Sequence, residues 1–277
     1  MSDTSQLTAH YDGNADLTAR IKAALDRGGF RPPLKLNVLA QFDELHMGGR
    51  QATERFAANL RINAGSRVLD LGCGLGGPAR FIASTTGARV TGVDLTSGYI
   101  RAGRELTGMA LMLDLVELRE GDIRDLPFDA QSFDVVYMIH VGMNIADKAT
   151  VFEQAARVLK PGGLFGIYDV MALQDNPVQF PVPWASGQDH SALSGPEIYR
   201  DGLENAGFRI LSQTDRSAFA LDTFARMASR QAAAGAPPAL GMHLVMGPDA
   251  ASRIDNMVAS LTAGRIAPVE IIAELPR

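Results

Sequence analysis

In the first half of the chain, Asp70, Asp94 and Asp122 each lie at or just after the end of a short apolar run. Asp70 lies in RVLDLGCGLGGPAR, two residues before the first glycine of a turn, Asp94 follows Gly72 by 22 residues, and Asp122 follows the next apolar run. Carboxylates accept hydrogen bonds from ribose hydroxyls and attract cations, and glycines let the backbone approach a ligand closely. The pattern predicts a site for a nucleotide-type ligand.

The glycine turn fits two classes of nucleotide site. Gly72, Gly74 and Gly77 satisfy GxGxxG, the fingerprint of dinucleotide-binding proteins, and Asp94 lies near the spacing of their ribose-binding acid. A carboxylate at Asp70 would repel a pyrophosphate, but it would attract a ligand that carries an ammonium and a sulfonium. We therefore expect S-adenosyl-L-methionine (SAM), and a dinucleotide-dependent oxidoreductase is the enzymatic alternative.

Alternating strands and helices must position these residues. Short apolar runs predict strands at residues 67–71, 88–93, 115–120, 133–139, 164–170, 208–213 and 268–275, and helical spacing predicts helices at 16–28, 50–60, 77–86, 97–107, 147–159, 217–234 and 249–263. Ser194 and Glu197 have the spacing of a capping box, which would start a further helix toward Asn205. The alternation predicts an α/β fold with a doubly wound parallel sheet that binds its ligand at the carboxyl ends of the strands.

The order of the motifs resembles that of the class I SAM-dependent methyltransferases. After DxGxGxG come Asp94 beyond a second strand, Gly121-Asp122 beyond a third, FDVVY at a fourth, and VLKPGG as a turn before a fifth. The resemblance implies a Rossmann-like, mostly parallel, seven-stranded sheet with an antiparallel last strand, and a reaction that converts SAM to S-adenosyl-L-homocysteine. It implies cofactor contacts from Tyr11, Asp70, Gly72, Cys73, Gly74, Asp94, Leu95, Asp122, Ile123 and Ile139.

More narrowly, the chain resembles small-molecule methyltransferases related to the ubiquinone-biosynthesis C-methyltransferases and the sarcosine/dimethylglycine N-methyltransferases, in the flanks HYDGNADL, FDELHMGGRQAT and PVEIIAEL. We expect residues 1–62 to form a helical N-terminal cap and residues 63–277 the SAM-binding domain. Residues 173–193, a stretch too long for an ordinary connection, and residues 215–264, a helical insertion, are expected to cover the acceptor as lids. Whether nitrogen, oxygen or carbon receives the methyl group stays open.

Residues that contact the methyl acceptor are expected around the carboxyl edge of the sheet. His140 lies just beyond the fourth strand, and two roles are open for it, a general base or a wall of the pocket. The other candidates are Glu44, His46, Asp169, Trp184 and His190. Many relatives have a histidine at the place of Asn144, so a role for that histidine does not carry over. The five histidines show no HxxxH or Cys/His cluster, and no metal is expected.

Composition restricts the partners. The chain has 277 residues, a formal net charge of −5 and a single cysteine, so it lacks the basic footprint of a nucleic-acid-binding protein and a disulfide framework. No stretch reaches the roughly 20 apolar residues of a membrane span, and the N-terminus has no secretory pattern. We expect a cytoplasmic enzyme with a small-molecule acceptor, and the oligomeric state is open, a homodimer included. A SAM-binding regulator without activity is the non-enzymatic alternative.

Overall fold

The computed structural model describes residues 17–175, 177–234 and 239–277. Its strands are β1 (Arg67–Leu71), β2 (Arg89–Asp94), β3 (Val116–Glu120), β4 (Phe133–Ile139), β5 (Leu159–Ala172), β6 (Arg209–Asp215) and β7 (Ile266–Glu274). They form one sheet in the order β3-β2-β1-β4-β5-β7-β6. Neighbours pair in parallel except β7, which is antiparallel to both β5 and β6. The predicted Rossmann-like, seven-stranded sheet with an antiparallel last strand is confirmed.

Strand β5 is longer than the sequence predicts. It begins at Leu159 and runs to Ala172, so the PGG of VLKPGG lies inside the strand and not in a turn before it. The pairing of β4 with β5 shifts register between Phe133 and Val135, because β5 has extra residues there and bulges. At the other end, Asp169 lies within the strand and not at its terminus.

The helices are α2 (Leu17–Arg27), α3 (Leu36–Leu39), α4 (Gly49–Ala58), α5 (Gly77–Thr86), α6 (Ser97–Met109), α7 (Lys148–Val158), α8 (Pro196–Asn205), α9 (Ser217–Ala234), α10 (His243–Met246) and α11 (Ala250–Thr262), with 3-10 helices η1 (Gly142–Asn144) and η2 (Gln188–His190). The sequence does not predict α3 and α10, since four residues show no period. The predicted capping box is wrong. Helix α8 follows Gly195 without a side-chain cap, and Pro196 occupies its first turn.

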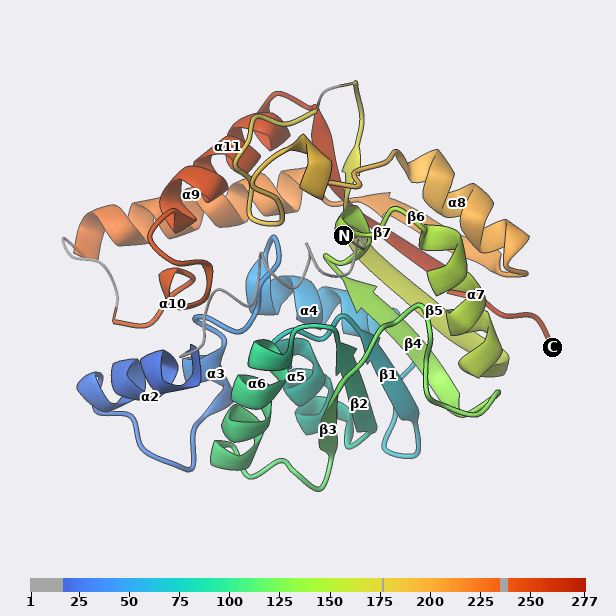
Figure 1. Cartoon of the computed structure of the whole chain (residues 1–277), viewed down its shortest axis with the longest axis horizontal. Coiled ribbons are helices and arrows are strands. Elements are labelled where there is room, and N and C mark those ends of the chain that lie inside the picture. The colour runs from blue at the N-terminus through green and yellow to red at the C-terminus, as the bar shows by residue number, and fades with distance from the viewer. Residues whose placement is uncertain (1–16, 176, 235–238) are drawn as a thin grey trace.

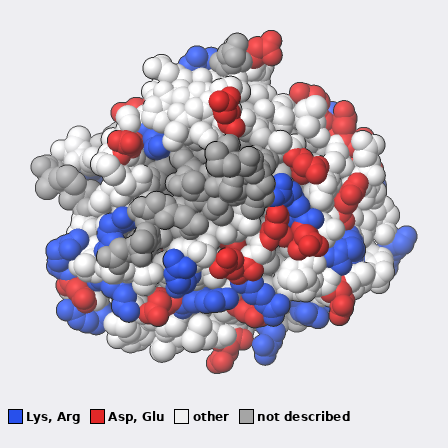
Figure 2. Space-filling model, in the orientation of Figure 1, with Lys and Arg blue, Asp and Glu red and all other residues white. Residues whose placement is uncertain are grey.

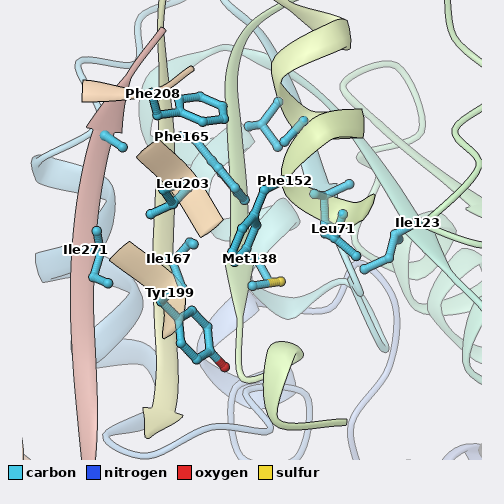
Figure 3. Close-up of a cluster of buried hydrophobic side chains, with 14 of the residues drawn as sticks. Leu71, Ile123, Met138, Phe152, Phe165, Ile167, Tyr199, Leu203, Phe208 and Ile271 are labelled. Carbon is cyan, nitrogen blue, oxygen red and sulfur yellow. The ribbon is translucent and has the colours of Figure 1, made fainter. Parts of the chain in front are cut away.

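Helices cover both faces of the sheet (Figure 1). Helices α4, α5 and α6 cover the first face, whose core includes Phe56, Ile82, Ile100, Val135, Tyr137 and Tyr168. Helices α7 and α8 cover the second face, and Figure 3 shows its core of Leu71, Ile123, Met138, Phe152, Phe165, Ile167, Tyr199, Leu203, Phe208 and Ile271. Because side chains alternate along a strand, neighbouring residues of β4 and β5 point to opposite faces.

The segments expected as lids lie together beyond the end of β5. Helices α9 and α11 contact each other and β7, and α10 contacts α2 and α11. Their shared apolar cluster with residues 178–193 includes Met47, Met143, Val170, Trp184, Met257 and Ile266. These segments therefore pack onto the sheet and onto the loops that follow its strands.

Charged side chains of both signs are interspersed on the face of the molecule shown in Figure 2. The described part of that face shows no extended field of one sign, in keeping with the small net charge of −5. Among the described residues, no helix is both long enough and apolar enough to cross a membrane.

Candidate functional site

The order of the strands reverses between β1 and β4, which are neighbours in the sheet although the chain visits β2 and β3 between them. Such a switch point leaves a crevice outside the carboxyl ends of the strands. Gly72 follows β1, and His140 and Val141 follow β4. The two turns touch, since a Cβ placed on Gly72 would lie 2.4 Å from a methyl carbon of Val141. The sequence motifs therefore meet at the expected edge.

The glycines of the turn after β1 have different roles. A Cβ on Gly76 would lie 2.8 Å from Leu118 Cδ1, and a Cβ on Gly77 would lie 2.3 Å from the Asp43 carbonyl oxygen. Both distances are too short for a side chain, as is the 2.4 Å at Gly72. A Cβ on Gly74, whose φ is +53°, would meet nothing nearer than Leu45 Cδ1 at 3.8 Å. Gly72, Gly76 and Gly77 therefore let the protein pack on itself, whereas a Cβ on Gly74 would make only ordinary van der Waals contacts.

Asp70 is buried at the centre of this edge. Its side chain points to the first face of the sheet, where its Oδ2 accepts a hydrogen bond from the Tyr137 hydroxyl at 2.8 Å, and the residue is 2% exposed. No Lys or Arg of the described chain forms an ion pair with it. Burial raises the pKa of Asp70 to about 8, and the negative charges of Asp94 and Glu44 act in the same direction. The site thus holds an acid that lacks a cation.

Asp94 fixes the geometry of two turns. Its Oδ2 accepts from the N–H of Gly74, and its Oδ1 from the N–H of Thr96, both at 2.8 Å. Burial raises the pKa of the Asp94 carboxyl, and the two hydrogen bonds partly offset that rise. Because each carboxylate oxygen has two lone pairs, both oxygens can accept a further hydrogen bond from a ligand.

Asp122 has a partner that sequence reasoning does not predict. The guanidinium of Arg124 donates to its Oδ2 at 2.7 Å, and the Arg124 N–H donates to its Oδ1 at 2.9 Å. These bonds lower the pKa of Asp122. Among the other expected cofactor contacts, Ile123, Ile139 and Cys73 are buried and Leu95 is half-buried, and burial raises the pKa of the Cys73 thiol. Tyr11 lies outside the described residues.

The structure brings together two of the expected acceptor-side residues, His46 and His140. Their ring centroids are 5.9 Å apart, and the Tyr168 ring lies 6.2 Å from the first and 5.3 Å from the second. Burial lowers the pKa of His46 to about 4, and it lowers the pKa of His140 well below its usual range. Both imidazoles are therefore neutral at pH 7.

Glu44 joins this group through two residues that sequence reasoning missed. Its Oε1 accepts from Arg50 Nε at 2.5 Å and its Oε2 from the Thr53 hydroxyl at 2.7 Å. The Thr53 oxygen is also 3.1 Å from His46 Nε2. Only the clustering of polar residues in FDELHMGGRQAT hints at this network, because the Gly48-Gly49 pair marks a turn but does not specify which side chains it brings together.

A buried ion pair holds this segment against the glycine turn. Arg80 in α5 is fully buried and donates to Asp43 Oδ2 and to the Leu75 carbonyl, each at 2.7 Å. A Cβ on Gly77 would lie 2.3 Å from the Asp43 carbonyl oxygen. The close contact places Glu44 and His46 beside the carboxyl edge of the sheet.

The remaining candidates have other partners, although the Asp169 carboxylate lies beside Gly142 in the turn after β4. Asp169 points to the second face, where it accepts from the Tyr199 hydroxyl at 2.9 Å. Trp184 is buried in the apolar cluster that the segments expected as lids share, and it donates to the Ser191 hydroxyl at 3.2 Å. His190 is exposed. Among the described residues, no group of three or more His, Cys, Asp or Glu could hold a metal ion.

Comparison with known proteins gives one family match. Residues 69–167 match the family model described as a methyltransferase domain. The chain is 34% identical over 179 residues to a sterol 24-C-methyltransferase of Yarrowia lipolytica, covering 61% of this chain and 47% of that protein. It is 31% identical over 176 residues to a glycine/sarcosine/dimethylglycine N-methyltransferase of Actinopolyspora halophila, covering 62% and 31%. The chain thus spans less than half the length of each of these relatives.

The fold is also that of solved methyltransferases. A geranyl diphosphate C-methyltransferase from Streptomyces coelicolor A3(2), in complex with S-adenosyl-L-homocysteine, superposes with a TM-score of 0.71, and the match covers 99% of this chain and 98% of that one. The two sequences are 18% identical, so this similarity concerns the fold.

Proposed function

We propose that this chain, which carries a methyltransferase domain at residues 69–167 and has the fold of the SAM-dependent methyltransferases, transfers a methyl group from SAM to a small molecule. The observation that supports this most is the burial of Asp70 without a cation. An isolated buried carboxylate is costly, and SAM has an ammonium and a sulfonium to offer it. The pyrophosphate of a dinucleotide offers Asp70 no cation and would be repelled by the ionised form of its carboxyl group, which disfavours the oxidoreductase alternative.

The residues present fit SAM. Asp94 has acceptor capacity left for the ribose hydroxyls, and no atom crowds the position where Gly74, which donates to Asp94, lacks a Cβ. Asp122 would accept a hydrogen bond from the adenine amino group and would keep its ion pair with Arg124. The further contacts in this proposal come from Tyr11, Gly72, Cys73, Leu95, Ile123 and Ile139.

Bound SAM supplies an activated methyl group and a good leaving group. The protein must then hold the acceptor atom about 3 to 3.5 Å from that methyl group, exclude water, and accept a proton where the acceptor loses one. His46 and His140 are neutral and buried at the carboxyl edge, so an imidazole is available for the proton. Residues 173–193 and 215–264 would cover the acceptor.

Calorimetry with the purified chain tests the cofactor, and a screen tests the reaction. We expect SAM and S-adenosyl-L-homocysteine to bind and NAD not to bind. Methyl-labelled SAM should then label a product from a library of amines, phenols and carbon acids, which also settles the atom that is methylated. Binding of NAD without binding of either sulfur compound would refute the proposal, and SAM binding without labelled product from any acceptor class would favour the regulator.

A cytoplasmic location is part of the proposal. Fractionation of the cells that produce the protein tests it, and light scattering tests the homodimer.

A further inference from the structure

The hydrogen bonds around His46 determine which of its ring nitrogens carries a hydrogen. The Thr53 oxygen lies 2.7 Å from Glu44 Oε2 and 3.1 Å from His46 Nε2. Glu44 is ion-paired with Arg50, so its carboxylate has no proton to donate. The single hydroxyl hydrogen of Thr53 must therefore point to Glu44. Toward His46, the Thr53 oxygen can only accept.

A second contact requires the same hydrogen position. The carbonyl oxygen of Gly49 lies 3.1 Å from the same Nε2 of His46, and a carbonyl can only accept. Nε2 therefore carries the hydrogen of the neutral ring. Nδ1 is left with a lone pair that can take up a proton.

Within the described part of the chain, His140 lacks hydrogen bonds that would fix its tautomer as those of His46 do. Its Nε2 is buried without a hydrogen-bond partner in the described chain, and burial together with His46 lowers its pKa. Glu44 Oε2, by contrast, lies 3.6 Å from His46 Nε2 and would stabilise a charged His46 ring. Of the other charges that face His46, Arg50 opposes protonation and Asp43 favours it. The two rings contact each other, so a single proton shared between them belongs on His46.

We propose that Nδ1 of His46 accepts the proton that the methyl acceptor loses, with Glu44 and Thr53 as positioning residues. His140 then forms a wall of the pocket, which is the second of the two roles predicted for it. The inference rests on the proposed methyl transfer. The acceptor's N–H, O–H or activated C–H bond breaks, and its proton moves to His46. A lone pair of the acceptor N or O, or the pair left on the acceptor carbon, forms the bond to the methyl carbon. The sulfur atom keeps the electron pair of the bond that it loses, and the imidazolium later releases its proton to water.

The first experiment needs no acceptor. Nitrogen-15 NMR of the full chain with labelled histidine distinguishes protonated from unprotonated ring nitrogens, and the His46→Gln spectrum assigns the signals. We expect His46 to be neutral with hydrogen on Nε2 at pH 7, in wild type and in Thr53→Ser. In Glu44→Gln, Thr53 is free to donate to the ring, so a population with hydrogen on Nδ1 should appear. A wild-type ring with hydrogen on Nδ1 would overturn the inference, and this result does not depend on whether the variant folds.

The second experiment uses an acceptor from the screen and two matched variants. The amide of Gln in His46→Gln can still donate to Gly49 and Thr53, but it cannot take up a proton. We expect His46→Gln to keep its SAM affinity within about threefold, to lose about 10² to 10⁴ in kcat, and to lose the acid limb of the pH profile. His140→Gln should keep that limb of the pH profile, even where the altered wall of the pocket lowers kcat.

The reverse pattern between the two variants would assign the proton to His140 and overturn the inference. A wild type that binds no SAM would instead refute the proposed function, and it would leave the NMR assignment of the His46 ring intact.

Discussion

At the scale of single residues, burial sets opposite protonation states for acids that share one edge of the sheet. Asp70 is buried with one hydroxyl donor, and its pKa is raised to about 8. Asp122 is about one-third exposed at its side chain, is paired with Arg124, and has a lowered pKa. At pH 7 the ligand-free site therefore holds a protonated acid in β1 and an ionised acid beyond β3. A cationic ligand would cause Asp70 to ionise and would leave Asp122 ionised.

This difference predicts a pH-dependent affinity for SAM. Below pH 8 the carboxyl of Asp70 is protonated in the free protein, and a cation favours its ionised form, so binding should release a proton. The dissociation constant should fall by up to about tenfold per pH unit as the pH rises toward 8, and then level off. Calorimetry from pH 6 to 9 measures this, in buffers with different ionisation enthalpies.

Asp70→Asn is the control, because it retains the titration of the ligand's own amino group. The variant should bind more weakly and without the component of the pH dependence that belongs to Asp70. An identical pH profile in the variant would show that Asp70 is not the group that loses the proton.

At the scale of elements, local sequence patterns predict the positions of most strands and helices. The predicted bounds differ from the observed ones where tertiary contacts determine the ends of an element. β1 and β4 have the predicted bounds, because their apolar runs are bounded by turn residues. β5 extends to Ala172 because it pairs along its length with β7, at the far end of the chain. No local pattern predicts that extension. The face of Asp169 follows from the alternation of side chains along β5, which places it opposite Tyr168.

The position of Asp169 leads to a prediction for Tyr199→Phe. Burial raises the pKa of Asp169 from 3.8 to about 6, and the Tyr199 hydroxyl opposes that rise. Loss of the hydroxyl should raise this pKa further, so the variant loses stability chiefly at pH values where the carboxyl must ionise. We expect the free energy of unfolding to drop by about 1 to 3 kcal/mol at pH 8, and by less at pH 5. Urea denaturation at the two pH values measures the difference.

SAM affinity is the internal control for that variant. Because Tyr199 and Asp169 lie on the second face, the dissociation constant for SAM should stay within about twofold of wild type. A large loss of affinity without a change in stability would place Asp169 in the ligand site.

At the scale of the whole molecule, the positions of Asp70, Gly74 and Asp94 at one edge of the sheet could be predicted from sequence, and the grouping of His46 with His140 could not. Asp70, Gly74 and Asp94 lie within one strand-turn-helix unit and the strand after it, so their spacing carries the signal. The contact of His46 with His140 requires a segment that the Asp43–Arg80 ion pair holds at the glycine turn. Ion pairs between residues so far apart in the chain leave no trace in periodicity or spacing.

This assembly from distant segments predicts how SAM should stabilise the molecule. A ligand at 100 times its dissociation constant adds about 2.7 kcal/mol to the free energy of unfolding, which raises the melting temperature by roughly 2 to 4 °C for a chain of this size. Beyond this global effect, local openings at the carboxyl edge should be suppressed. Hydrogen exchange should slow most at residues 70–77, 94–97, 121–124 and 139–144, and change least in α7 and α8, which cover the second face. Protection centred on α7 and α8, or a melting shift with NAD alone, would mean that the ligand binds elsewhere or is of another class.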